Sequence, residues 1–167
     1  MQKKWLALIL VAIVLLLFLG PPVSNFLNVK LVPAIGDAME WRSRWLAGRH
    51  GVDCGRVRIG GDPRAATACA LQAQAEGKPF RVRYDIMGID SAVAGGVVRT
   101  PDGRLYGLSF DGNPTGAGGT SLFRQRVSQL PCPNPPHLWV NPKGRVNCFQ
   151  QQLSQPNGIT APNIEPY

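Results

Sequence analysis

The chain has 167 residues, a length typical of one folded domain with accessory segments. Its 18 lysines and arginines outnumber 10 acidic residues, so the formal charge of +8 favours anionic partners, although the same excess also serves solubility. The only histidines, His50 and His137, have no metal-binding spacing such as H-E-x-x-H, and we predict neither a metal nor a cofactor.

Residues 1–23 have the features of a signal anchor. Lys3 and Lys4 precede the apolar run 5–19, which is the order of charge and apolarity found at the start of exported proteins. The run is shorter than the ~20 residues of a usual span, and no pair of small residues marks a cleavage site. We expect an uncleaved transmembrane helix, with a cleaved signal as the alternative. The positive-inside rule then predicts a single-pass protein of the bacterial inner membrane whose C-terminal domain lies in the periplasm.

Residues 24–51 are expected to form a juxtamembrane linker with an amphipathic helix. Trp41 and Trp45 are one helical turn apart among arginines, a pattern typical of a helix on a membrane surface. The alternative is that both tryptophans pack into the domain core or against a partner helix. One helical face is formed by residues at 3.6-residue spacing: Ile35, Ala38, Met39 and Trp45.

Four cysteines, in an exported domain, predict two disulfides. Three pairings are possible, and the preferred one brackets two compact units by joining Cys54 to Cys69 and Cys132 to Cys148. Neither pair is a C-x-x-C, so a redox motif or a zinc site is the weaker interpretation.

A helix is predicted after the first cysteine. Asp62 is a suitable N-cap, Pro63 suits the first helical position, and Gly77 suits the C-terminal cap. A stripe of small residues predicts close approach to a sheet: Ala66, Cys69, Ala70 and Ala73.

The pattern then changes to the two-residue period of β-strands. Residues 80–86 alternate between apolar and polar, and residues 92–110 form a hairpin around a turn at 101–103. Its predicted register pairs Val98 with Tyr106, Gly96 with Leu108, and Ala94 with Phe110. Residues 122–130 are ambiguous between helix and strand, and residues 137–150 repeat the hairpin signature.

The predicted fold class is therefore α+β. One helix packs on an antiparallel sheet of about five strands within an exported domain, residues 52–150, that carries two disulfides. The polar, proline-rich residues 151–167 are expected to be a disordered tail.

No catalytic residue is predicted. Ser109 lacks the G-x-S-x-G elbow, and the glycine-rich loop 112–120 lacks the G-K-[ST] of a phosphate loop. No spacing pairs two of the domain's carboxylates as a glycosidase would require: Glu76, Asp85, Asp90 and Asp111.

Arginine is the candidate binding residue. Arg81, Arg83 and Arg99 are expected on the polar face of the sheet, where guanidinium groups would bind phosphate or carboxylate. The alternative is an ordinary solvated face. Export and the absence of stacking aromatics among these arginines argue against nucleic acid.

The pattern D-C-G…C…G-K-P-F…P-D-G-R-L-Y-G-L-S-F-D-G, spread over about residues 53–148, resembles small bacterial envelope proteins and lipoproteins. The chain departs from the lipoprotein form because it has no cysteine placed for acylation. The resemblance implies export and a disulfide-bearing domain, and no activity. We expect a membrane-anchored envelope interaction module that contacts an anionic lipid, a wall polymer or an envelope protein; the alternative is a small exported hydrolase.

Overall fold

The computed structural model describes residues 5, 9, 11, 36–116, 120 and 124–149. The expected tail, residues 151–167, and all of the expected anchor except three helical positions lie outside these residues. Among the residues described, no helix has the length and the apolar character that crossing a membrane requires. The chain divides into two units, residues Met1–Asp37 and Ala38–Tyr167, and the fold below is that of the second unit.

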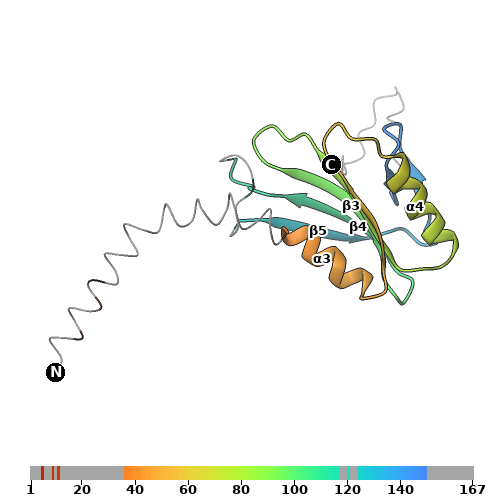
Figure 1. Ribbon diagram of the computed structural model, residues 1–167, viewed down its shortest axis with the longest axis horizontal. Helices are drawn as coiled ribbons and strands as arrows, with labels where there is room; N and C mark the ends of the chain where they lie inside the picture. Colours follow the sequence, from red (N-terminus) through yellow and green to blue (C-terminus); the bar gives the residue numbers. More distant parts are fainter. Residues whose placement is uncertain are drawn as a thin grey trace, which may run out of the picture. The chain divides into compact units, whose positions relative to one another are not determined.

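This unit is an α+β fold built on a five-stranded sheet (Figure 1). The strands lie in chain order: β1 (Val52–Val57), β2 (Phe80–Ile86), β3 (Val93–Arg99), β4 (Leu105–Asp111) and β5 (Arg126–Pro131). Two helices pack on it, α3 (Ala38–Ala47) and α4 (Arg64–Ala75). A separate two-stranded ribbon consists of β6 (Trp139–Val140) and β7 (Val146–Asn147).

The sheet is mixed, so the predicted all-antiparallel sheet is wrong at one strand pair. β2 to β5 are antiparallel neighbours, whereas β1 runs parallel to β2. Parallel neighbours need a crossover connection, and α4 supplies it between β1 and β2. The register of β1 is irregular between Asp53 and Arg56, where Gly55 has φ +88°. This bulge breaks the two-residue period, so the sequence did not reveal the strand.

The central hairpin has the predicted register. Val98 pairs with Tyr106, and the pairing continues in step to Ala94 and Phe110. Gly103 closes the turn at φ +85°, which a glycine adopts without strain. The ambiguous segment is a strand at its C-terminal end, because β5 pairs with β4 along its length.

Two helices cover the sheet, where the sequence predicted one. α3, expected in the linker, buries Met39, Leu46 and Ala47 against one face of β3 and β4. Gly96 permits this close approach, because a Cβ built there would lie 2.9 Å from Met39 Cε. Trp45, which the helical spacing placed on the same face as Met39, is exposed, as is Trp41, so the alternative in which both tryptophans pack into the domain core is wrong.

α4 covers the other face through its predicted stripe of small residues. Ala66, Ala70 and Ala73 are buried against the apolar side of β2. The helix begins at Arg64 with Pro63 as its N-cap, so the predicted cap at Asp62 is wrong by one residue, although the Asp62 carboxylate accepts a hydrogen bond from the Arg64 backbone N–H.

Both predicted disulfides are confirmed. One joins Cys54 of β1 to Cys69 of α4, and the other joins Cys132, just after β5, to Cys148, just after β7. The first disulfide therefore holds α4 to the edge strand β1, and the second holds the ribbon to the far edge strand β5.

Tyr84 connects three elements on the α4 side. Its buried hydroxyl lies 2.9 Å from Thr67 Oγ1 of α4 and accepts a hydrogen bond from the Val146 backbone N–H of β7 at 3.3 Å. Burial raises the pKa of this phenol, although the two hydrogen bonds and Arg145 oppose that shift. The neutral tyrosine is thus part of the folded core.

Candidate functional site

The three candidate arginines do not share one face of the sheet, which corrects the sequence prediction. In the register of β2 and β3, Arg81 lies opposite Val98, whereas Arg99 lies opposite Phe80. Arg81 and Arg83 therefore face α3, and Arg99 faces the α4 side. The Arg99 guanidinium lies against Gly77, which follows α4, and Gly103 of the hairpin turn.

Arg81 is not a solvent-facing side chain. It lies between α3 and β1, where its guanidinium donates to Glu40 of α3 and to Asp53 of β1. Only 12% of its side chain is exposed. Glu40 also accepts from Arg44 one helical turn further along, at 3.1 Å. The arginine therefore joins two elements of the domain through their carboxylates.

Arg83 is more deeply buried than Arg81. Its Nε donates to Asp85 at 2.9 Å, and its guanidinium lies 5.2 Å from the ring centroid of Phe110. Arg56 of β1 donates to the other oxygen of Asp85 at 2.7 Å. The side chains of Arg83 and Asp85 are 7% and 11% exposed, whereas that of Arg56 is 51% exposed. One carboxylate thus serves a buried and a half-exposed arginine.

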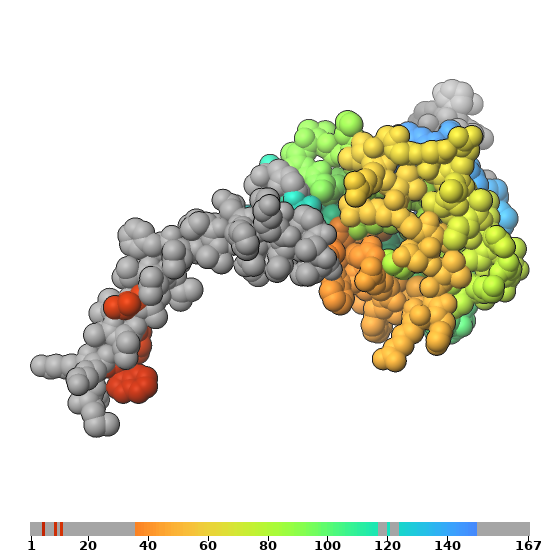
Figure 2. Space-filling view, viewed as in Figure 1, coloured from red at the N-terminus to blue at the C-terminus, as the bar shows by residue number. Residues whose placement is uncertain are grey.

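The outer side of α3 presents aromatic and basic side chains together. Trp41 and Trp45 are 60% and 72% exposed, and they stand one helical turn apart. Arg44 is 62% exposed in its side chain, and Arg42 is also exposed. Atoms of α3, orange in Figure 2, form part of the molecular surface. We call these four residues, Trp41, Arg42, Arg44 and Trp45, the Trp–Arg face.

The Trp–Arg face is held in place by the sheet. Arg42 donates through Nε and Nη2 to Gln129 Oε1 of β5, at 3.0 and 2.8 Å. The same guanidinium lies 5.1 Å from the ring of Trp45, within the range of a cation–π contact. Contacts that fix these side chains before binding reduce the conformational entropy that a partner must remove.

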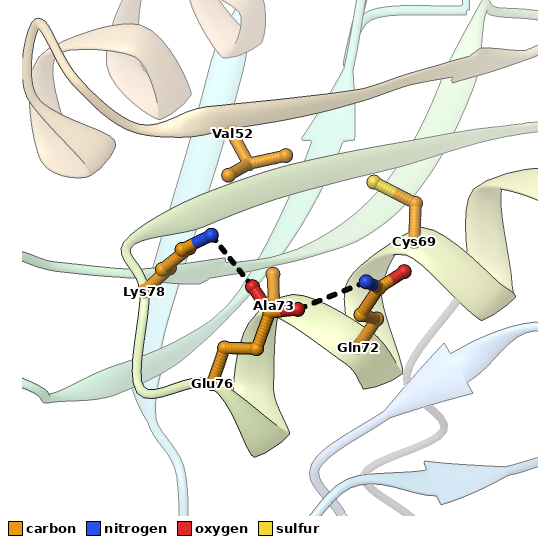
Figure 3. A pocket seen from close by; sticks show the side chains of 6 residues that line it. All are labelled: Val52, Cys69, Gln72, Ala73, Glu76 and Lys78. Atoms are coloured by element: carbon orange, nitrogen blue, oxygen red, sulfur yellow. Dashed lines mark hydrogen bonds and ion pairs between the residues drawn. The ribbon is translucent and has the colours of Figure 1, made fainter.

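A surface pocket of about 220 Å³ lies between α4 and β1 (Figure 3). Its polar residues bond to one another: Glu76 accepts from Lys78 at 2.7 Å and from Gln72 at 2.9 Å. The hydrogen bond from Lys78, and then that from Gln72, lowers the pKa of Glu76, so this carboxylate is ionised at neutral pH. The remaining lining residues are Val52, Cys69 and Ala73. The pocket thus presents an internally paired charge and no nucleophile with a base beside it.

The residues weighed for catalysis are distributed over the domain. Ser109 lies in mid-strand between Gly95 of β3 and Ser128 of β5. His137 contacts Trp139 edge to face, with ring centroids 4.4 Å apart. In the described part of the chain, neither histidine is hydrogen-bonded to a serine, and no three acidic, histidine or cysteine residues gather as metal ligands do.

Comparison with protein-family models, curated proteins and solved structures gives no match. Function is therefore inferred from the residues themselves. Sequence reasoning found both tryptophans of the Trp–Arg face from their helical spacing. It missed the contact between Arg42 and Gln129, because these residues are 87 positions apart and no local pattern relates them.

Proposed function

We propose that the chain is an exported, membrane-anchored interaction module of a bacterial envelope, which acts through a contact surface and not through a reaction. The order of Lys3, Lys4 and the apolar run supports export and anchoring. The four cysteines support export as well, since all of them are paired in disulfides and such bonds persist in oxidising compartments.

The Trp–Arg face is the observation that carries this proposal. Large aromatic side chains are normally at least partly covered in a folded monomer, and an exposed aromatic cluster beside charged groups is typical of a binding surface. Trp41 and Trp45 both remain more than half exposed although α3 itself is packed on the sheet. Tryptophan and arginine are also the residue types enriched where binding energy concentrates.

The polar interior supports the same assignment. Three carboxylates around α3 and β1 pair with arginines of the domain: Glu40 and Asp53 with Arg81, and Asp85 with Arg56 and Arg83. Both faces of the sheet are covered by helices. Recognition by this domain would therefore use its outer surface, where α3 presents two exposed tryptophans beside exposed arginines.

A photocrosslinking amino acid at position 45 of the full chain, expressed in bacteria, tests the proposal. We expect ultraviolet-dependent adducts at position 45 whose added mass is that of a lipid or of a protein. The matched control is the same amino acid at position 139, because Trp139 is an exposed tryptophan of the ribbon on the other side of the sheet. Equal adducts at both positions, or none at position 45, would contradict an interaction module that works through α3.

A further inference from the structure

The two tryptophans of α3 point away from the sheet. Successive helical residues are turned by about 100°, so Trp41 lies roughly opposite Met39, which is 1% exposed beneath the helix. Trp45 is displaced from Trp41 by only about 40° around the axis. The two indoles thus lie side by side along the outer surface of α3.

Basic side chains flank these indoles. Arg42 lies on the β5 side, where it bonds to Gln129, and Arg44 lies on the opposite side, towards Glu40. Glu40, the acidic residue of α3, is already engaged by Arg44 and Arg81. The face therefore combines apolar rings with positive charge, and the carboxylate within α3 is compensated from within the domain.

The described domain as a whole also carries a net positive charge. Residues 38–149 contain fifteen arginines and lysines against eight aspartates and glutamates. An anionic surface therefore attracts the domain as a whole, and the Trp–Arg face adds a local contact. Indole rings favour the headgroup level of a bilayer, where the ring is half in apolar surroundings and half in water.

The position of α3 in the chain brings a bilayer within reach. Eighteen residues separate the end of the apolar run at Leu19 from the start of α3 at Ala38, and a chain of this length spans at most about 60 Å. If residues 5–19 are held in a membrane, the Trp–Arg face is confined to a small volume beside that membrane. Tethering of this kind raises the effective concentration of the second contact.

Other exposed apolar side chains fit an anionic surface less well. Met87 and Ile89 project from the connection between β2 and β3, but Asp90 follows them directly. Trp139 is less exposed than either tryptophan of α3 and is contacted by His137. The combination of two adjacent, outward indoles with flanking arginines is found on α3.

We infer that the Trp–Arg face docks on the anionic headgroups of the lipid bilayer in which the chain is anchored. The inference rests on the proposed function and names its partner. The indoles insert at headgroup level, and Arg42 and Arg44 lie over lipid phosphates. Docking would hold α3 against the membrane and direct the α4 side of the sheet away from it.

Quenching of tryptophan fluorescence by brominated lipid tests this contact directly. The full chain carries Trp45 as its sole tryptophan, the other three being replaced by phenylalanine, and is reconstituted into vesicles. The vesicles contain phosphatidylcholine alone or with one third phosphatidylglycerol, with bromine near the headgroup end of one acyl chain. A chain that retains only Trp139 is the matched control.

We expect bromine to quench Trp45 severalfold more than Trp139, and more strongly in the anionic vesicles. R42Q/R44Q should lower the ratio of docked to undocked domain in anionic vesicles about thirtyfold, as expected from removing two basic groups near an anionic surface. R64Q/R104Q, which removes two exposed arginines outside α3, lowers the charge of the domain by the same amount and should reduce the ratio far less than R42Q/R44Q does. Raising NaCl to 0.5 M should weaken docking, because salt screens exposed charges.

Each of the following results would overturn the inference. Quenching of Trp45 no greater than that of Trp139 would show that the Trp–Arg face does not contact the bilayer. Equal quenching of Trp45 with and without phosphatidylglycerol would show that docking does not depend on anionic headgroups. Protein adducts at position 45 in cells, without quenching in vesicles, would leave the interaction module standing and make its partner a protein. An absence of both would contradict the proposed function as well.

Discussion

Replacement of Asp85 should destabilise the fold, because its carboxylate pairs with two arginines, one of them buried. Its carboxylate accepts from Arg83 at 2.9 Å and from Arg56 at 2.7 Å. Asp85→Ala leaves Arg83, with only 7% of its side chain exposed, without its partner on the same strand. Breaking a buried ion pair from one side costs about 3–5 kcal/mol. Because Arg83 keeps its contact with Phe110, we expect the lower end, about 3 kcal/mol.

The two arginines on Asp85 supply graded controls. Arg83→Met leaves Asp85 paired with Arg56. We therefore expect the free energy of unfolding to fall by roughly 1–3 kcal/mol, the range for a hydrogen bond to a charged group. Arg56→Gln removes a half-exposed partner and should cost at most about 1 kcal/mol. Urea unfolding of the full chain in detergent, followed by circular dichroism with disulfides intact, measures all three. A cost below 1 kcal/mol for Asp85→Ala, or an equal cost for Arg56→Gln, would refute this account of the buried arginine.

Three further changes test the packing by the same unfolding assay. Gly96→Ala should destabilise by about 1–3 kcal/mol, because its Cβ would lie 2.3 Å from a carbonyl oxygen of β2 and 2.9 Å from Met39 Cε; no loss would contradict close packing of α3. Tyr84→Phe should lower the free energy of unfolding by about 1–2 kcal/mol at pH 8. This difference should shrink above pH 10, because the pKa of Tyr84 is raised in the folded protein, so ionisation of the phenol opposes folding and the unsubstituted protein loses stability as pH rises. A difference independent of pH up to 11 would argue against the buried phenol. Replacing Cys54 and Cys69 by serine should cost about 3 kcal/mol for a separation of 15 residues, and an unchanged midpoint would count against this disulfide.

The features predicted correctly from sequence are those that local chemistry determines. The hairpin register followed from a Pro-Asp-Gly turn and from large residues that meet small ones, such as Phe110 opposite Ala94. The helix at 64–75 followed from its flanking Pro63 and Gly77 and from its alanine stripe. The two disulfides join cysteines only 15 and 16 positions apart in sequence, so proximity along the chain favoured the correct pairing.

The placement of the arginines depended on information that no local pattern holds. Six residues connect β2 to β3, and a change of one residue in this connection would exchange the two faces of β2 relative to β3. The partners of Arg81, Glu40 and Asp53, lie 41 and 28 positions away. With α3 interpreted as a linker helix, nothing in the sequence indicated that it would cover these side chains.

Export of the domain is the claim on which the proposed function and its bilayer contact depend. The most direct measurement is the activity of alkaline phosphatase fused after Tyr167 of the full chain, assayed in bacterial membranes washed with carbonate. The enzyme folds into its active form only outside the reducing cytoplasm, so the account predicts high activity retained in the washed membranes. An inactive fusion would contradict export, and activity released entirely into the wash would contradict anchoring.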